Sequence, residues 1–204
     1  MAAPDPDFFL ASASPRRREL LLQLGYRFVV LAAGIEERQG LRESGEAYVL
    51  RVAREKALAG LGVRPPGSLL PVLGADTEVL LGERVLGKPR SREDGLSMLG
   101  QLSGRTHEVL CAVAVNDGLR ERVALSRTRV TLRALEPGEI AAYWASGEPC
   151  DKAGAYAIQG LAATFVERIE GSYTGVVGLP LFETAALLRD FGIEGWQAAY
   201  RGAE

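Results

Sequence analysis

The sequence predicts an α/β fold, because apolar strand patterns and amphipathic helix patterns alternate along its 204 residues. Residues 8–11 form a short apolar run, which is typical of a buried strand. Ser14 and Pro15 follow as a suitable N-cap and first helical residue, and leucines then recur at helical spacing until Gly25 ends the pattern. The chain therefore begins with a strand, a loop and a helix.

A second strand, a long helix and a third strand are expected next. Residues 26–31 have a strand-like apolar pattern. Residues 46–61 place apolar side chains at helical spacing, and Lys56 falls on the apolar face of that helix. The third strand is expected over residues 69–81, with an interruption by a turn at residues 74–77.

The middle of the chain predicts a helix followed by a hairpin. Ser91, with Asp94 three residues later, resembles a capping box that opens a helix, and Gly104 closes this helix. Two strand patterns, at residues 109–115 and 123–132, flank an Asn-Asp-Gly sequence, which is a strong signal for a β-hairpin.

The last third of the chain predicts two helices, a loop and a strand. Pro137 begins a helix that Gly147 ends. Residues 148–160 are polar and punctuated by glycine, without helical or strand periodicity, which indicates a functional loop. A strand at residues 164–169 and a helix over residues 180–191 follow, and no repeat or long linker divides the sequence.

Composition narrows the class of protein. The formal net charge is −2, which argues against a protein dedicated to nucleic-acid binding. The sequence does not open with a basic segment and a long apolar run, and no stretch approaches the roughly 20 apolar residues of a membrane helix. We therefore expect a cytoplasmic protein that binds neither nucleic acid nor membrane. Cys111 and Cys150 are expected to be reduced thiols.

Three consecutive arginines, Arg16, Arg17 and Arg18, lie in the first turn of the first predicted helix. They add to the positive partial charge at the helix N-terminus. Free backbone N–H groups, the hydroxyls of Ser12 and Ser14 and the guanidinium groups together supply the parts of a phosphate-binding site. The pattern predicts a phosphate or polyphosphate ligand, and the alternative is a solvated arginine patch.

Carboxylates near these arginines suggest acid/base or metal chemistry. Asp76 lies in the predicted turn, where a carboxylate caps the turn, binds a metal or transfers protons. Glu36 and Glu37, which are expected to end the second strand, are candidate partners of Asp76 as oxygen ligands of Mg²⁺. The alternative for this pair is a solvated acidic loop.

Several other polar residues have two interpretations each. Lys56 and Lys88 are candidates to neutralise a polyphosphate and a departing pyrophosphate. The alternative for Lys56 is a side chain that extends from the apolar face to water, and the alternative for Lys88 is a solvated lysine. Thr77 and Gln159 offer the hydroxyl and amide groups that base recognition needs, or they stabilise loops. His107 is expected to be a structural or surface residue.

Seven short motifs occur in a fixed order along nearly the whole chain. They are Leu10-Ala11-Ser12-Ala13-Ser14-Pro15-Arg16-Arg17, the Glu37 segment, Glu55-Lys56-Ala57, Gly74-Ala75-Asp76-Thr77, Lys88-Pro89, Leu102-Ser103-Gly104, and residues 151–156 with Gln159-Gly160. This ordered set resembles the Maf family of nucleoside triphosphate pyrophosphatases. An ordered set is far more specific than any one of its motifs.

The resemblance implies an α/β fold with a long central mixed sheet, flanking helices and two lobes around a cleft, similar to inosine triphosphate pyrophosphatases. It implies that residues 1–204 form a single Maf-like domain of two lobes. It also implies hydrolysis between the α- and β-phosphates of a nucleotide, which yields a nucleoside monophosphate and pyrophosphate and depends on Mg²⁺ or Mn²⁺. A homodimer is expected on the same ground.

The resemblance also implies roles for individual residues. Asp76 matches the proton acceptor of the family, and Glu37 and Asp76 match its metal site. Phosphate-contacting positions of the family fall on Ser12, Arg17, Lys56 and Lys88. Specificity positions of the branch that acts on dTTP and UTP fall on Arg16, Thr77 and Gln159.

The expected substrates are therefore dTTP and UTP, together with modified pyrimidine nucleotides. A sister branch that acts on 7-methyl-GTP usually has a different residue after the Ser-Pro pair. Glu78, Gly87 and Thr174 depart from the family pattern, which bears on substrate preference more than on the reaction. The alternative function is a nucleotide-sensing regulator of septum formation or cell division that has no significant turnover.

Overall fold

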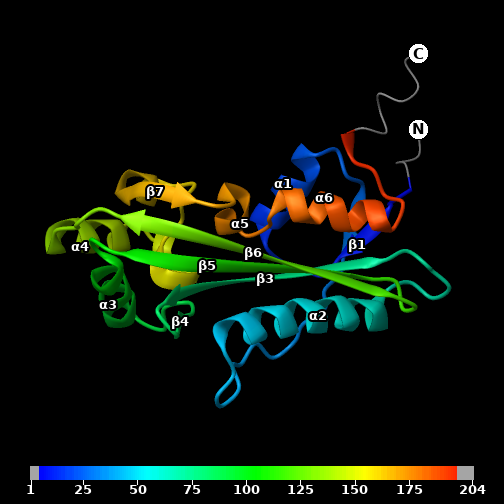
Figure 1. Ribbon diagram of the computed structural model, residues 1–204, viewed down its shortest axis with the longest axis horizontal. Helices are drawn as coiled ribbons and strands as arrows, with labels where there is room; N and C mark the ends of the chain where they lie inside the picture. The colour runs from blue at the N-terminus through cyan, green and yellow to red at the C-terminus, as the bar shows by residue number, and fades with distance from the viewer. Residues whose placement is uncertain (1–4, 197–204) are drawn as a thin grey trace.

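Three long antiparallel strands, β3, β5 and β6, form the centre of the protein in a computed structural model that describes residues 5–196 (Figure 1). They belong to a seven-stranded mixed sheet of order β2-β1-β3-β5-β6-β7, with β4 paired to β3. The strands are β1 (Phe8–Leu10), β2 (Phe28–Val30), β3 (Val72–Leu81), β4 (Arg84–Leu86), β5 (Thr106–Asn116), β6 (Glu121–Leu132) and β7 (Val166–Glu170). The α/β class and the mixed sheet are thus confirmed.

Helices cover both faces of this sheet. The helices are α1 (Pro15–Gln23), α2 (Gly45–Val63), α3 (Arg92–Leu102), α4 (Pro137–Ala145), α5 (Tyr173–Val177) and α6 (Leu181–Asp190). In Figure 1, α2 lies below the long strands and α1 and α6 lie above them, whereas α3 and α4 lie at the opposite end of the sheet. The predicted functional loop contains two short 3₁₀ turns, Glu148–Asp151 and Ala153–Ala155.

The helix boundaries follow the chemistry of single residues. The Ser91 hydroxyl accepts a hydrogen bond of 3.2 Å from the Asp94 amide at the start of α3. Gly25 and Gly104 adopt positive φ just beyond α1 and α3, where a residue with a Cβ would be strained. The second strand is shorter than expected, because β2 pairs with β1 over three residues only, from Phe28 to Val30.

The apolar core consists of two main parts, one on each side of the sheet. The larger cluster packs under α1 and α6 and includes Leu21, Leu73 and Leu188. The smaller cluster lies between α2 and the sheet and is centred on Val49 and Ala53. Full burial of such side chains contributes about 1.5–3 kcal/mol for each large one. These two clusters therefore hold α1 and α2 on opposite faces of β3.

The turn predicted at residues 74–77 is wrong, because β3 passes through these residues without interruption. Asp76 pairs with Ala112 of β5 in regular antiparallel register. Gly74 is needed for helix packing: a Cβ there would lie 2.5 Å from the Ala57 amide nitrogen of α2 and closer still to the Ala53 carbonyl oxygen. The glycine that suggested a turn instead permits the close contact of α2 with β3.

One edge of β3 is open in the middle of the strand. β3 pairs with β1 at Val72 and Leu73, and with β4 from Val79 to Leu81. Within the described sheet, residues 74–78 therefore have no strand beside them on that edge. Ligands bind in such crevices, beyond the carboxyl end of a parallel strand where the chain turns away.

His107 was expected to be either a structural or a surface residue, and the structure shows that it is structural. It is 2% exposed on β5, and its Nε2 atom lies 2.8 Å from the hydroxyl of Tyr156. Burial lowers the pKa of His107 to about 4. The imidazole is therefore neutral in the folded protein at ordinary pH.

Two further expectations concern membranes and thiols. In the part of the chain from residue 5 to residue 196, no helix combines the length and the apolar character that crossing a bilayer requires. Cys111 is buried and Cys150 is exposed, and both are free thiols.

Replacing Gly74 with Ala should destabilise the protein by about 1–3 kcal/mol, because the new methyl group would meet α2 backbone atoms that cannot rotate away. Urea unfolding of Gly74→Ala measures this change. Gly100→Ala is the matched control, since a Cβ at the exposed Gly100 in α3 meets nothing within 4 Å. An unchanged midpoint for Gly74→Ala would contradict the close helix-to-strand contact.

His107 should make stability fall in acid. Its pKa is lowered from 6.5 to about 4 on folding, so the unfolded chain takes up a proton first as the pH falls through this window. The loss should be roughly 2 kcal/mol by pH 5 relative to His107→Gln, which does not titrate. Urea unfolding of both proteins at pH 7.5 and pH 5 tests this, and identical pH dependence would refute it.

Candidate active site

A cavity of about 450 Å³ opens at the free edge of β3. This volume lies within the range of about 300–1,000 Å³ that is usual for small-molecule sites. The structure brings all nine site residues predicted from the sequence to its wall. They are Ser12, Arg16, Arg17, Glu37, Lys56, Asp76, Thr77, Lys88 and Gln159.

Arg17 is a cation of this cavity that is held by three hydrogen bonds. Its Nε donates to the Gly178 carbonyl oxygen at 2.8 Å. The same guanidinium donates to the hydroxyls of Ser12 at 3.0 Å and Thr77 at 3.3 Å. Arg17 is 9% exposed, so its charge lies in a largely desolvated position. A buried guanidinium that is neutralised by no carboxylate in the described contacts is suited to an anionic ligand.

The other two arginines of α1 differ from each other. Arg16 lines the cavity and donates from Nε to the Val177 carbonyl oxygen at 3.2 Å. Burial lowers the pKa of Arg16, and nearby Asp151 partly opposes this shift. Arg18 is exposed and does not line the cavity, so the expectation that all three arginines converge on one point is wrong. Successive helix residues are separated by about 100°, so three in a row cannot share one face.

Ser14 occupies the N-cap position of α1, but within residues 5–196 its side chain caps no backbone amide. Its own N–H donates to the Ser12 hydroxyl at 3.3 Å. The loop hydroxyls thus order the turn and Arg17, and the first N–H groups of α1 stay available.

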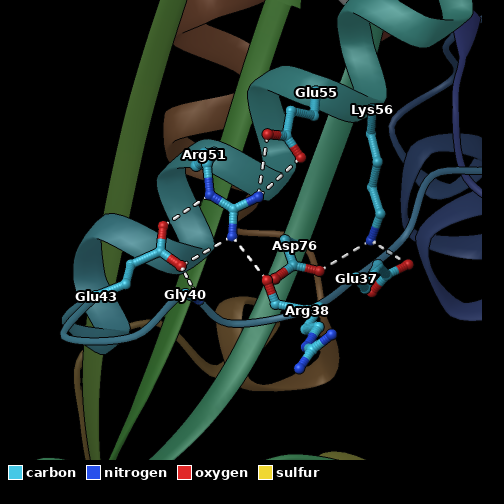
Figure 2. A network of polar contacts seen from close by, with 8 residues as sticks. All are labelled: Glu37, Arg38, Gly40, Glu43, Arg51, Glu55, Lys56 and Asp76. Atoms are coloured by element: carbon cyan, nitrogen blue, oxygen red, sulfur yellow. Dashed lines mark hydrogen bonds and ion pairs between the residues drawn. The ribbon is translucent and has the colours of Figure 1, made fainter.

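Asp76 and Lys56 form a buried ion pair at the cavity wall. Lys56 Nζ lies 2.9 Å from Asp76 Oδ1 and 3.0 Å from Glu37 Oε1. Figure 2 shows Lys56 reaching from α2 to these two carboxylates. The Lys56 and Asp76 side chains are 10% and 5% exposed, so water screens their interaction little. Oδ2 of Asp76 is buried and has no hydrogen-bond partner among the described residues.

Glu36 and Glu37 do not end a strand, because β2 stops at Val30 and the following residues to the start of α2 have no regular structure. Glu37 points to Lys56, whereas Glu36 is exposed and is not part of the cavity wall. The acidic pair therefore splits into one site residue and one surface residue. An extended loop, like a strand, sends neighbouring side chains in different directions.

Arg51 anchors the loop that carries Glu37 (Figure 2). Its guanidinium donates to Glu43 at 2.7 and 2.8 Å, to Glu55 at 3.0 Å and to the Arg38 carbonyl oxygen at 3.0 Å. These hydrogen bonds lower the pKa of Glu43 to about 2. One side chain of α2 thus ties down the loop beside Glu37.

Glu78 is the site residue that sequence reasoning missed as a functional group. It is 8% exposed, lines the cavity and follows Asp76 by two residues on β3. Burial, and then the charges of Asp76 and Glu37, raise the pKa of Glu78 to about 8. The two-residue period of a strand was the available signal. The mistaken turn at residues 74–77 concealed it.

The loop after α4 supplies the opposite wall of the cavity. Asp151 and Lys152 form an ion pair there, which lowers the pKa of Asp151. Tyr156 is fixed from behind by His107, and Gln159 lies exposed at the rim. The functional loop predicted from its composition thus faces the arginines of α1.

The residues present fit a divalent metal ion. Carboxylate oxygens are the ligands that Mg²⁺ and Mn²⁺ prefer, and buried Asp76 Oδ2 lacks a partner. Over residues 5–196 no group of three or more His, Cys, Asp or Glu side chains is placed to enclose a metal by itself. Mg²⁺ usually takes one or two carboxylates and completes its shell with waters and substrate phosphates. Glu37 and Asp76 remain the predicted metal residues.

Fold and cavity together define a class: an α/β protein whose small-molecule cavity brings buried carboxylates together with guanidinium and ammonium groups. The model of the Maf family, described as Maf-like protein, matches residues 7–191. The chain belongs to this family.

Curated relatives are similar over nearly their whole length. The chain is 57% identical over 192 residues, 93% of this chain and 95% of the relative, to a dTTP/UTP pyrophosphatase of Alkalilimnicola ehrlichii. It is 52% identical over 193 residues, 94% of this chain and 91% of the relative, to a dTTP/UTP pyrophosphatase of Saccharophagus degradans. Among solved structures, the Staphylococcus aureus Ham1 protein is a distant likeness: 14% identity, a TM-score of 0.38, and coverage of 61% of this chain and 71% of that one.

Replacing Arg51 with Lys should loosen the loop that carries Glu37, because an ammonium group cannot make the forked contacts to Glu43 and Glu55. The amide hydrogens of Gly40 and Glu43 should exchange about tenfold faster or more, as expected for the loss of hydrogen bonds to a charged group. Hydrogen–deuterium exchange measures this rate. Arg54→Lys is the control, since Arg54 makes one ion pair, with Glu121. Equal exchange in both variants would exclude the anchoring role.

Proposed function

We propose that this protein is a nucleotide pyrophosphatase that hydrolyses dTTP and UTP to the nucleoside monophosphate and pyrophosphate, with modified pyrimidine nucleotides as further substrates. The observation that carries the proposal is the cavity at the edge of β3, where buried Asp76 lies among the cations Arg16, Arg17, Lys56 and Lys88. A polyphosphate needs the cations for binding, but binding alone gains nothing from a buried carboxylate. The names of the curated relatives support the same reaction.

In this proposal the cations hold the triphosphate. Arg17 is preorganised by its bonds to Gly178 and Ser12, so little side-chain entropy is lost when it meets a phosphate. Lys88 and Arg16 face the same cavity and would neutralise the pyrophosphate as it leaves. Thr77 and Gln159 are the groups proposed to recognise the pyrimidine base and exclude others.

Asp76 is the proposed proton acceptor for the attacking water. Lys56 occupies Oδ1 and leaves Oδ2 without a partner among the described residues, so one carboxylate is oriented by a cation and still has an acceptor atom. Glu37 and Asp76 would hold Mg²⁺ or Mn²⁺, and this ion, when bound, would polarise the α-phosphoryl group and offset its developing negative charge. The protein chain itself contributes orientation, desolvation and the proton acceptor.

The proposal extends to the cellular role. We place the protein in the cytoplasm, as a homodimer that removes non-standard or excess pyrimidine triphosphates. The homodimer is carried over from the family resemblance.

Pyrophosphate release with Mg²⁺ or Mn²⁺ tests the proposal across dTTP, UTP, CTP, GTP and 7-methyl-GTP. We expect dTTP and UTP to be preferred. Asp76→Asn should lower turnover by about 100-fold to 10,000-fold, the usual contribution of a general base, and should weaken dTTP binding much less. Asp190→Asn, on an exposed end of α6, is the control that should leave both unchanged.

Two results would contradict this proposal in different ways. Retained activity in Asp76→Asn, or an equal loss of turnover and dTTP affinity, would remove Asp76 from the role of base. Tight dTTP binding without pyrophosphate release from the unaltered protein would instead favour a nucleotide sensor, the alternative expected for a regulator of septum formation.

A further inference from the structure

Glu78 is a third carboxylate of the cavity, and none of the roles given above uses it. It is 8% exposed and lies on β3 two residues after Asp76, so both side chains leave the strand on the face toward α2. Both residues line the same cavity.

Glu78 and Asp76 each have one carboxyl oxygen that lacks a hydrogen-bond partner among the described residues. Glu78 Oε2 and Asp76 Oδ2 are both buried, and among residues 5–196 neither atom has a hydrogen-bond partner. Burying carboxyl oxygens without partners costs free energy, and ionising both groups costs more because the two negative charges would repel each other. A cation placed between them would relieve both costs.

No cation among residues 5–196 forms an ion pair or hydrogen bond with these two oxygens. Lys56 Nζ is committed to Asp76 Oδ1 and Glu37 Oε1, at 2.9 and 3.0 Å. Lys56 therefore uses one oxygen of Asp76 and leaves Asp76 Oδ2 without a partner among the described residues. Lys88 lines the cavity from an exposed position, and within the described contacts it forms no ion pair with Glu78.

We propose that Asp76 and Glu78 together bind a divalent cation through the carboxylate oxygens that have no partner, so that Glu78 is an additional metal ligand of this protein. The proposal rests on the proposed function, because it names a residue that would hold the metal of that reaction. Side chains two residues apart on a strand start about 6.7 Å from each other. Two carboxylates reaching inward from that separation suit one ion with metal–oxygen distances of about 2.1 Å.

Binding of Mn²⁺ to the nucleotide-free full-length protein tests the proposal without relying on activity. Electron paramagnetic resonance of free Mn²⁺ during a titration gives the affinity. Glu78→Gln keeps the shape of the side chain but cannot ionise to a carboxylate, and we expect Mn²⁺ to bind at least about tenfold more weakly. Glu83→Gln is the matched control, because Glu83 is an exposed acid in the turn between β3 and β4.

Glu37→Gln completes the comparison. If Asp76 and Glu78 hold the ion, Glu37→Gln should weaken Mn²⁺ binding less than Glu78→Gln does. Mn²⁺ affinity in Glu78→Gln equal to that of the unaltered protein, or no detectable Mn²⁺ binding by the unaltered protein, would overturn the proposal. Pyrophosphate release by the unaltered protein is measured separately, so failure of the metal proposal is distinguishable from failure of the proposed function.

Discussion

The contact of α2 with β3 at Gly74 is the constraint on which the site depends. Because Gly74 has no side chain, the helix backbone at Ala53 and Ala57 lies directly on the strand. That approach brings Lys56 within 2.9 Å of Asp76, and the same helix holds the Glu37 loop through Arg51. A helix displaced outward by one methyl group would stretch the ion pair and the loop anchor together, since both begin on α2.

The second constraint is the balance of negative and positive charges in the cavity. The charged side chains come from distant parts of the chain. Carboxylates enter the cavity from β3 and from the Glu37 loop, whereas cations enter from α1, from α2 and from Lys88. The sheet makes this possible because β3 has an open edge between its pairing with β1 and its pairing with β4. A continuous neighbouring strand would cover the backbone beside Asp76 and leave no room for a ligand.

Much of the fold could be predicted from local patterns in the sequence. Helical spacing correctly placed Lys56 on the apolar face of its helix, because that spacing depends on neighbouring residues alone, and the structure shows that Lys56 is buried there. The hairpin around Asn116-Asp117-Gly118 and the capped start of α3 were predictable for the same reason. The prediction was wrong at a residue type, glycine, that occurs in two different structural settings. Gly74 signals a turn in sequence but serves close packing in the structure, and this single error hid the shared face of Asp76 and Glu78.

The sequence by itself determined the α/β class, most helix and strand positions, the family resemblance and nine of the residues that line the cavity. The tertiary structure alone decided which carboxylates have partners. Arg18 turns outward while Arg17 is buried, Glu36 is exposed while Glu37 meets Lys56, and Glu78 is buried beside Asp76. The physical reason is that a hydrogen bond or ion pair is formed at about 3 Å between residues far apart in the chain. Sequence spacing specifies the face of an element, whereas such a distance is set by how the elements pack.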